Sequence, residues 1–394
     1  RITRLPTAFN TDRGDETASL LPQAAGDLAK LLAGAGGCSP YIRSLVEKEA
    51  DWLWPALHCP ETAVADQFSA LDNCGASELA VALRQAKRRI ALVTALSDLA
   101  GVWSLETVTK TLSDFADLCC ELALRAALAP EIKRGKLPGM TEADLHSGAG
   151  MVVLAMGKMG AGELNYSSDI DLICLFDETR FDKDAYADAR GAFVRATKRM
   201  VAMLSDLTSD GYVFRTDLRL RPDPGVTPVC VAMAGAESYY ESQGRTWERA
   251  AYIKARAAAG DRDAGARFLH SLRPFVWRRH LDFAAIQDAH DMRLRIRSHK
   301  GLHGPITLPG HNMKLGRGGI REIEFFTQTR QLISGGRDAA LRARGTVAAL
   351  KLLTEKNWVT QDAAQKLTAH YKEHREVEHR LQMINDAQTH SLPN

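Results

Sequence analysis

The stretch Ser167-Ser-Asp-Ile-Asp-Leu-Ile-Cys-Leu-Phe176 combines the pattern of a buried strand with two carboxylates, and the rest of the chain is interpreted from it. Ile170 to Phe176 is a short apolar run, typical of a strand that is covered on both faces. Asp169 and Asp171 are two residues apart, so the alternation of side chains along a strand places both on one face. A buried carboxylate is costly unless a cation or hydrogen bonds compensate for it. The pair therefore predicts a metal site on a sheet.

A second candidate strand, Val213 to Arg221, alternates strictly and supplies a third carboxylate, Asp217. Three carboxylates close to arginines suit a Mg²⁺-dependent reaction on a nucleotide phosphate, because hard cations prefer oxygen ligands and guanidinium groups neutralise phosphate oxygens. We expect Asp169, Asp171 and Asp217 to be catalytic and to bind Mg²⁺. The residues expected on the same face as Asp217 are Arg215, Arg219 and Arg221, and those expected to face the core are Phe214, Thr216, Leu218 and Leu220. An exposed edge strand would give Arg219 and Arg221 the same alternation without any phosphate contact.

A glycine-rich segment, Gly157-Lys-Met-Gly-Ala-Gly162, follows another short apolar run, Met151 to Met156. Glycines after a strand allow backbone N–H groups to approach a phosphate closely. We therefore expect Gly157, Lys158 and Gly160 to contact phosphate. Ser168, directly before the carboxylate pair, is suited either to donate a hydrogen bond to a phosphate oxygen or to cap a turn.

Two further groups of polar residues have both a functional and a structural interpretation. Lys254 and Arg256 are suited to meet an attacking phosphate, and they are equally well explained as solvated side chains. Arg321 and Glu324 share a stripe of a helix predicted over Ile320 to Ile333, where they would position substrate or form a salt-bridged contact between domains. A basic run, Arg293, Arg295, Arg297 and Lys300, reads more readily as an exposed face than as a nucleic-acid patch.

The pattern along the chain is helical, then mixed, then helical. Leu20 to Pro130 has helical spacing throughout, and so do segments after Gly260, including Ala363 to Ala387. Between them, strand, turn, strand, an amphipathic helix over Ala189 to Leu207 and a third strand form one small unit. We therefore predict an N-terminal helical region at 1–130, a catalytic domain at 131–260 and a C-terminal helical domain at 261–394.

The totals exclude several classes of protein. The chain has 394 residues, is 45% hydrophobic and 25% charged, and carries a formal net charge of only +3, which does not indicate nucleic acid as a partner. No apolar run is long enough for a membrane helix, and the first residues lack the apolar core of a signal peptide. We expect a cytoplasmic protein without a membrane partner. The missing initiator Met and the end straight after a helical pattern suggest a fragment of a longer chain.

At these residues the sequence resembles the nucleotidyltransferase superfamily, in which Asp-x-Asp follows a glycine-containing turn and a third Asp lies on a later strand. More narrowly, it resembles the family of glutamine synthetase adenylyltransferase/adenylyl-removing enzymes. The blocks that carry this likeness are Gly157 to Leu172, Asp217-Leu-Arg-Leu-Arg-Pro222, Gln243-Gly-Arg-Thr-Trp-Glu-Arg249, Ile253-Lys-Ala-Arg256 and Gly318-Gly-Ile-Arg-Glu-Ile-Glu-Phe325. The likeness implies an α+β fold: a small mixed nucleotidyltransferase-type sheet with helices, flanked by all-α regions.

The resemblance also implies an activity. Glu163-Leu-Asn-Tyr-Ser-Ser-Asp169 is similar to the N-terminal, adenylyl-removing half of that family, in which inorganic phosphate releases AMP from a tyrosine of adenylylated glutamine synthetase as ADP. The implied cofactor is Mg²⁺, and the implied partners are glutamine synthetase, phosphate, ADP or ATP, and a PII signal protein. Transfer of AMP from ATP to a protein tyrosine, and a regulatory module that binds a nucleotide or PII without catalysis, remain alternatives. Ala161 and Gly162 depart from the Gly or Ser and the Arg that are usual there, which affects phosphate recognition rather than the carboxylates.

Overall fold

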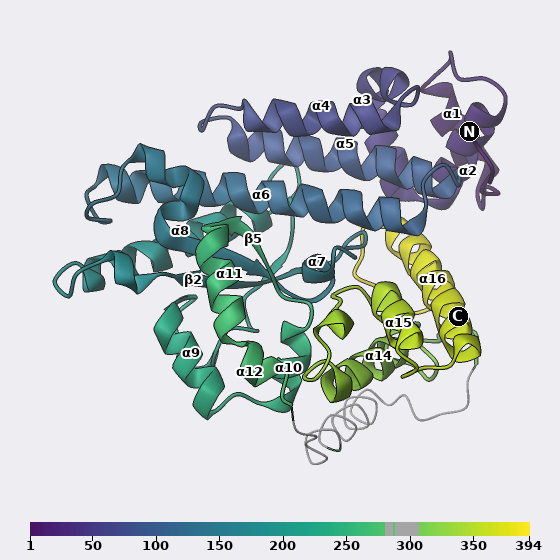
Figure 1. Cartoon of the computed structure of the whole chain (residues 1–394). Coiled ribbons are helices and arrows are strands. Elements are labelled where there is room, and N and C mark those ends of the chain that lie inside the picture. Colours follow the sequence, from purple (N-terminus) through teal and green to yellow (C-terminus); the bar gives the residue numbers. More distant parts are fainter. Residues whose placement is uncertain (280–286, 288–306) are drawn as a thin grey trace.

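A computed structural model describes residues 1–279, 287 and 307–394. Figure 1 shows a small sheet with helices on both of its faces, an N-terminal group of helices above it and a C-terminal group beside it. The fold is therefore α+β with helical flanks, as the sequence predicts. The basic run from Arg293 to Lys300 lies outside the described residues. None of the helices in the described part of the chain is long and apolar enough to cross a membrane.

Among the described residues the sheet is mixed and has five strands. They are β1 (Met151–Ala155), β2 (Ile170–Phe176), β3 (Thr216–Asp217), β4 (Cys230–Ala232) and β5 (Arg256–Gly260). The strand order is β3-β2-β1-β5, with β4 also on β2. β1 pairs antiparallel with both β2 and β5, whereas β3 and β4 pair parallel with the start and the end of β2. β2 is thus the central strand, which explains its continuous apolar run.

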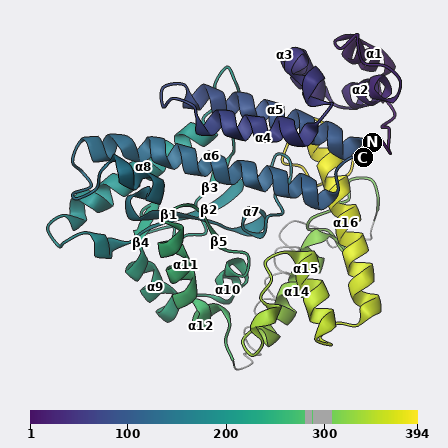
Figure 2. The ribbon, with the colours of Figure 1, turned by 45° about the horizontal axis from the view of Figure 1, so that its top comes forward.

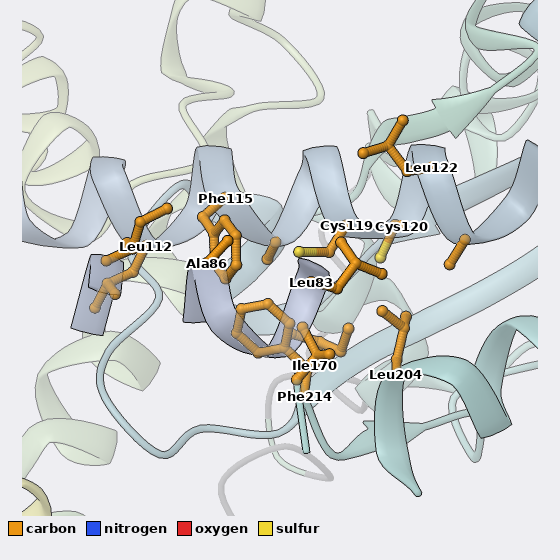
Figure 3. Packing of buried hydrophobic residues seen from close by; sticks show 14 of the residues in the cluster. Leu83, Ala86, Leu112, Phe115, Cys119, Cys120, Leu122, Ile170, Leu204 and Phe214 are labelled. Atoms are coloured by element: carbon orange, nitrogen blue, oxygen red, sulfur yellow. The ribbon is translucent and has the colours of Figure 1, made fainter. Parts of the chain in front are cut away.

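Alternate residues of the strands enter two separate cores, one on each face of the sheet. Val153 and Cys174 belong to the larger core, and Val152 and Ile173 belong to the smaller one. The larger core continues into the N-terminal helices, where Phe115 meets Phe214 with ring centroids 5.7 Å apart (Figure 3). The helices before the sheet are α1 (Thr11–Ser19), α2 (Asp27–Cys38), α3 (Pro40–Ala56), α4 (Pro60–Asp72), α5 (Leu79–Leu99), α6 (Leu105–Lys133) and the 3₁₀ helix η1 (Glu142–Gly150).

Helices within the mixed unit cover both faces of the sheet. After β2 come the 3₁₀ helix η2 (Glu178–Arg180) and α8 (Tyr186–Ser205), the amphipathic helix that the sequence predicts, which packs with α6 against the larger core. Helices α9 (Met233–Ser242), α10 (Thr246–Tyr252), α11 (Arg262–Ser271) and α12 (Arg273–Val276) cover the other face.

The C-terminal helices form a layer beside the sheet, in which Ile320, Ile323, Leu350 and Tyr371 make a small core. Its elements are α14 (Ile320–Ser334), the 3₁₀ helix η3 (Ala339–Leu341), α15 (Thr346–Glu355) and α16 (Gln361–Met383). The segment after α16 turns back along the chain that precedes α14, where Met313 N donates to His390 O at 2.7 Å. Figure 2 shows α7 (Gly157–Ala161) between the sheet and this layer.

One local prediction is wrong. The strand predicted over Val213 to Arg221 shrinks to Thr216–Asp217, because the Asp217 carboxylate accepts a hydrogen bond from Arg219 N at 2.8 Å and so forms an Asx turn. Arg219 and Arg221 therefore do not continue a strand face with Asp217. The glycine-rich segment folds as the single helical turn α7, Gly157–Ala161.

Phe193 on α8 offers a test of the larger core. Its side chain is fully buried and its ring stacks on Phe176 with centroids 4.9 Å apart. We expect Phe193→Ala to lower the free energy of unfolding by about 3–5 kcal/mol, because truncation leaves a cavity between α8 and β2. Urea denaturation followed by circular dichroism measures the change. Leu207→Ala is the control, since that side chain is 79% exposed; equal losses for the two variants would contradict the assigned core.

Candidate functional site

Parallel pairing of β2 with β3 brings two of the predicted carboxylates side by side. In this register Ile170 lies opposite Thr216, and Asp171 lies opposite Asp217. Paired residues on neighbouring strands project to the same face of a sheet. Two strand positions 46 residues apart in sequence thus place their carboxylates on one face, as the sequence predicts.

Asp169 lies directly before β2 and is held from two directions. Its Oδ1 accepts a hydrogen bond from Arg215 Nε at 2.9 Å, and its Oδ2 accepts one from Gln388 Nε2 at 3.0 Å. Arg215 also donates to the Tyr212 hydroxyl at 2.7 Å and to the backbone oxygen of Ser167. The residue leading into β3 and the segment after α16 therefore fix the orientation of this carboxylate together.

Asp171 is the carboxylate with the least compensation. No hydrogen-bond donor reaches its side chain from the residues that the structure describes, and its Oδ2 would lie 2.8 Å from a Cβ added at Gly157. Burial and the neighbouring carboxylates of Asp217 and Asp169 raise the pKa of Asp171 to about 6. Asp217 differs, because hydrogen bonds donated by the Arg219 side chain lower its pKa.

The three carboxylates are ligands of the kind that a hard cation prefers, but they do not converge on one point as a preformed site would. Three carboxylates with one lacking any donor are what Mg²⁺ would compensate. Among the described residues, however, no three acidic, histidine or cysteine side chains converge as a preformed metal site. Asp217 instead faces the guanidinium of Arg219, whose side chain is 84% exposed. Because exposed ion pairs contribute little stability, a cation could displace Arg219 at small cost.

The predicted phosphate ligands at α7 are engaged or tightly packed. Lys158 Nζ donates to Asn165 Oδ1 at 2.9 Å and pairs with Glu378 of α16 at 3.2 Å, and burial lowers the pKa of Lys158 to about 7. A Cβ added to Gly160 would lie 2.1 Å from Lys254 O, so this glycine allows α7 to approach the chain before β5. Gly157, with φ of 53°, opens the helical turn in the left-handed region.

Lys254 and Arg256 are not solvated. Lys254 Nζ lies 2.7 Å from Glu324 Oε1 and 3.3 Å from Glu163 Oε2, with its side chain 6% exposed. Arg256 pairs with Asp117 of α6, with Nη2 and Oδ1 2.8 Å apart. Glu324 thus forms the salt-bridged contact between α14 and the sheet unit that was one of its two predicted interpretations.

The other predicted residues differ in how many hydrogen bonds and ion pairs their side chains make. Arg221 donates to the carbonyl oxygens of Leu218 at 2.9 Å and Pro224 at 2.8 Å, which folds it onto its own turn. Ser168 is half-buried beside Asp169, and its hydroxyl has no hydrogen-bond partner in the described part of the chain. Arg321 is 53% exposed, and its only ion pair there is a long one, 3.9 Å to Glu324.

Beyond Arg321 and Glu324, sequence reasoning missed the residues of the C-terminal layer that contact this site. Gln388 contacts Asp169, Glu378 contacts Lys158, and Asp386 accepts hydrogen bonds from the Ser167 and Tyr212 hydroxyls at 2.6 and 2.8 Å. Lys314 lies just before the glycines at 316, 318 and 319 that lead into α14. Its positive charge acts to lower the pKa of Asp171. The sequence pattern that could have identified Lys314 is a lysine directly before a turn rich in glycine.

Comparison with known proteins gives the family. The model for glutamate-ammonia ligase adenylyltransferase matches residues 29–271. The chain belongs to this family. Relatives named bifunctional glutamine synthetase adenylyltransferase/adenylyl-removing enzyme include one from Bradyrhizobium sp., 48% identical over 95% of this chain, and one from Agrobacterium fabrum, 45% identical over 99%.

The match covers only part of those relatives. The chain spans 39% of the Bradyrhizobium protein and 41% of the Agrobacterium protein. Residues 290–394 also match the model for GlnD PII-uridylyltransferase. The adenylyltransferase family membership therefore rests on nearly the whole chain, while the chain itself corresponds to about two fifths of its bifunctional relatives.

The raised pKa of Asp171 predicts that this residue destabilises the fold at neutral pH. Its folded-state pKa of about 6 exceeds the ordinary value near 4, so the folded chain binds the extra proton between these values and loses stability as the pH rises through them. We expect Asp171→Asn to raise the free energy of unfolding by about 1–2 kcal/mol at pH 7.5 in the absence of divalent cations, with the gain absent at pH 4.

Urea denaturation at both pH values measures this difference. Asp184→Asn is the control, because Asp184 is exposed and lies away from the carboxylates. A gain of the same size at both pH values would show that electrostatic repulsion at Asp171 is not its source.

Proposed function

We propose that this chain removes AMP from an adenylylated tyrosine of glutamine synthetase by Mg²⁺-dependent phosphorolysis. The observation that carries the proposal is the juxtaposition of Asp171 and Asp217 on paired strands, with Asp169 beside them, in a chain of the glutamate-ammonia ligase adenylyltransferase family. The motif Glu163-Leu-Asn-Tyr-Ser-Ser-Asp169 favours the removing activity over the transferring one. The activity would serve cytoplasmic nitrogen regulation by restoring active glutamine synthetase.

In this reaction an oxygen of inorganic phosphate forms a bond to the adenylyl phosphorus while the bond from that phosphorus to the tyrosine oxygen breaks. The products are ADP and a tyrosine whose oxygen takes up the proton that the attacking hydrogen phosphate loses. Asp169, Asp171 and Asp217 would hold Mg²⁺, which when bound supplies positive charge for the phosphoryl oxygens. The chain itself mainly positions groups and neutralises charge, as is usual in phosphoryl transfer.

Individual residues have definable tasks in this scheme. Arg215 and Gln388 hold the Asp169 carboxylate in one orientation. The Ser168 hydroxyl, which has no hydrogen-bond partner among the described residues, would donate to a phosphate oxygen. The buried ion pair between Lys254 and Glu324 holds α14 against the chain that leads into β5.

Regulation by a PII signal protein is part of the proposal. The match of residues 290–394 to the GlnD PII-uridylyltransferase model supports it, since that description names a PII-directed enzyme. Residues Gln388 and Asp386 of this region contact groups at the carboxylate site. A partner bound to this region could therefore change the position of Gln388 and so the orientation of the Asp169 carboxylate.

Adenylyl transfer from ATP is the nearest alternative, because the same three carboxylates could serve it. Incubation of the chain with adenylylated glutamine synthetase, phosphate and Mg²⁺ should release ADP. In a parallel reaction, unmodified glutamine synthetase with labelled ATP should gain no AMP. Label incorporated into the protein without ADP release in the first reaction would reverse the assignment.

Substitutions at the carboxylates test the proposal against a binding module without catalysis. We expect Asp169→Asn and Asp171→Asn each to lower the rate of ADP release by at least about 100-fold, because each removes a negative charge that the phosphoryl-bound cation needs. The exposed control Asp184→Asn should keep the full rate. A folded Asp171→Asn variant that supports unchanged metal-dependent turnover would contradict the catalytic assignment.

A further inference from the structure

The anionic phosphates of the proposed reaction need cations, and most basic residues near the carboxylates are already paired. Lys158 pairs with Glu378, and Lys254 pairs with Glu324 and Glu163. Arg256 pairs with Asp117. Breaking a buried ion pair to bind a ligand leaves an uncompensated charge behind, which is strongly unfavourable. An incoming phosphate should therefore use other cations.

Lys314 is a cation near Asp171 that forms no such ion pair with a described residue. Its side chain is half-buried and makes no ion pair or hydrogen bond with any residue that the structure describes. Lys158 and Arg321 both lie close enough to Lys314 for their charges to interact with it, and Arg321 N donates a hydrogen bond to Lys314 O at 3.0 Å. The anions that partly compensate Lys314 are Glu378, Glu324 and Asp171. Glu378 is paired with Lys158 and Glu324 with Lys254, whereas Asp171 has no ion pair with a described residue.

The backbone around Lys314 is fixed, which distinguishes it from a lysine on a free loop. Asn312 Oδ1 accepts hydrogen bonds from Lys314 N at 3.1 Å and from Leu315 N at 2.8 Å. Lys314 O accepts one from Arg321 N at 3.0 Å, which ties the residue to the first turn of α14. Met313, the residue before it, is bonded to His390 on the returning C-terminal segment. A preorganised position of this kind lowers the entropic cost of binding a ligand.

Charge repulsion at this point supports a role in anion binding. Burial and the neighbouring Arg321 lower the pKa of Lys314 below its ordinary value. An anion between Lys314 and Arg321 would relieve this repulsion and would form charge-assisted hydrogen bonds with both. Arg321 is available for this, since it is 53% exposed and only loosely paired with Glu324.

We infer that Lys314, together with Arg321, binds a phosphate oxyanion beside the three carboxylates. The inference deepens the proposed function and rests on it for the identity of the anion, which is either the attacking inorganic phosphate or a phosphate of the nucleotide. It assigns to the segment before α14 the task that the glycine-rich segment at α7 was expected to perform. Phosphate recognition and the carboxylates would then come from opposite sides of the site, the C-terminal layer and the sheet.

The test compares Lys314→Met, Lys314→Arg and the control Lys351→Met, which removes an exposed lysine of α15. Isothermal titration calorimetry with inorganic phosphate alone, and separately with ADP and Mg²⁺, measures binding to the whole chain. We expect Lys314→Met to weaken one of the two ligands by about 10- to 100-fold, the range for one charge-assisted hydrogen bond, and Lys314→Arg to retain most of the affinity. Whichever ligand is weakened identifies the source of the bound oxyanion.

Kinetics separate this inference from the proposed function. With adenylylated glutamine synthetase as substrate, weaker phosphate binding should raise the KM for phosphate while leaving the KM for the protein substrate unchanged. Suppose that the wild-type chain releases no ADP, and that Lys314→Met binds phosphate or ADP more weakly than the wild type. The proposed function then fails and the oxyanion site stands. If Lys314→Met is folded and binds both ligands as tightly as Lys351→Met, the oxyanion site is refuted whatever the activity.

Discussion

The parallel register that sets Asp171 opposite Asp217 is the constraint on which the rest of the site depends. Two carboxylates on neighbouring strands repel each other, and burial of Asp171 increases the cost of keeping both ionised. The fold tolerates this arrangement because β2 is anchored on both edges, by β1 over its length and by β4 at its end. A central strand with two hydrophobic faces can carry an unfavourable pair at one end without losing its register.

The three carboxylates are compensated to different degrees, and the difference has a structural origin. Asp169 precedes β2, where Arg215 and the C-terminal segment reach it. Asp217 ends β3, and the turn that follows brings Arg219 back onto it. Asp171 lies inside β2 against Gly157, and no residue in the described part of the chain donates a hydrogen bond to it. The least compensated position is therefore the one most deeply built into the sheet, which is where a cation would contribute most.

The sequence predicted the elements whose pattern is local. Met151–Ala155 and Ile170–Phe176 were recognisable from uninterrupted apolar runs, and α8 was recognisable from its helical spacing. The third strand was predicted too long, because alternation over Val213 to Arg221 cannot reveal that the Asp217 side chain would cap a turn at Arg219. Ion-pair partners could not be predicted from the sequence for a different reason. Lys158 and Glu378 are 220 residues apart, and only the folded chain brings them together. The roles assigned to the individual site residues stay predictions.

The buried charges between the sheet unit and the C-terminal layer explain why the site cannot be assigned to the sheet alone. Glu163 accepts hydrogen bonds from Thr346 N at 2.8 Å and the Tyr371 hydroxyl at 3.2 Å, and it also pairs with Lys254. Buried ionic networks of this kind are weak sources of stability but are strongly selective for one arrangement of their members. A displacement of α16 would remove the partner of Lys158 and the donor to Asp169 together. The position of the C-terminal layer therefore sets the charge balance around the carboxylates.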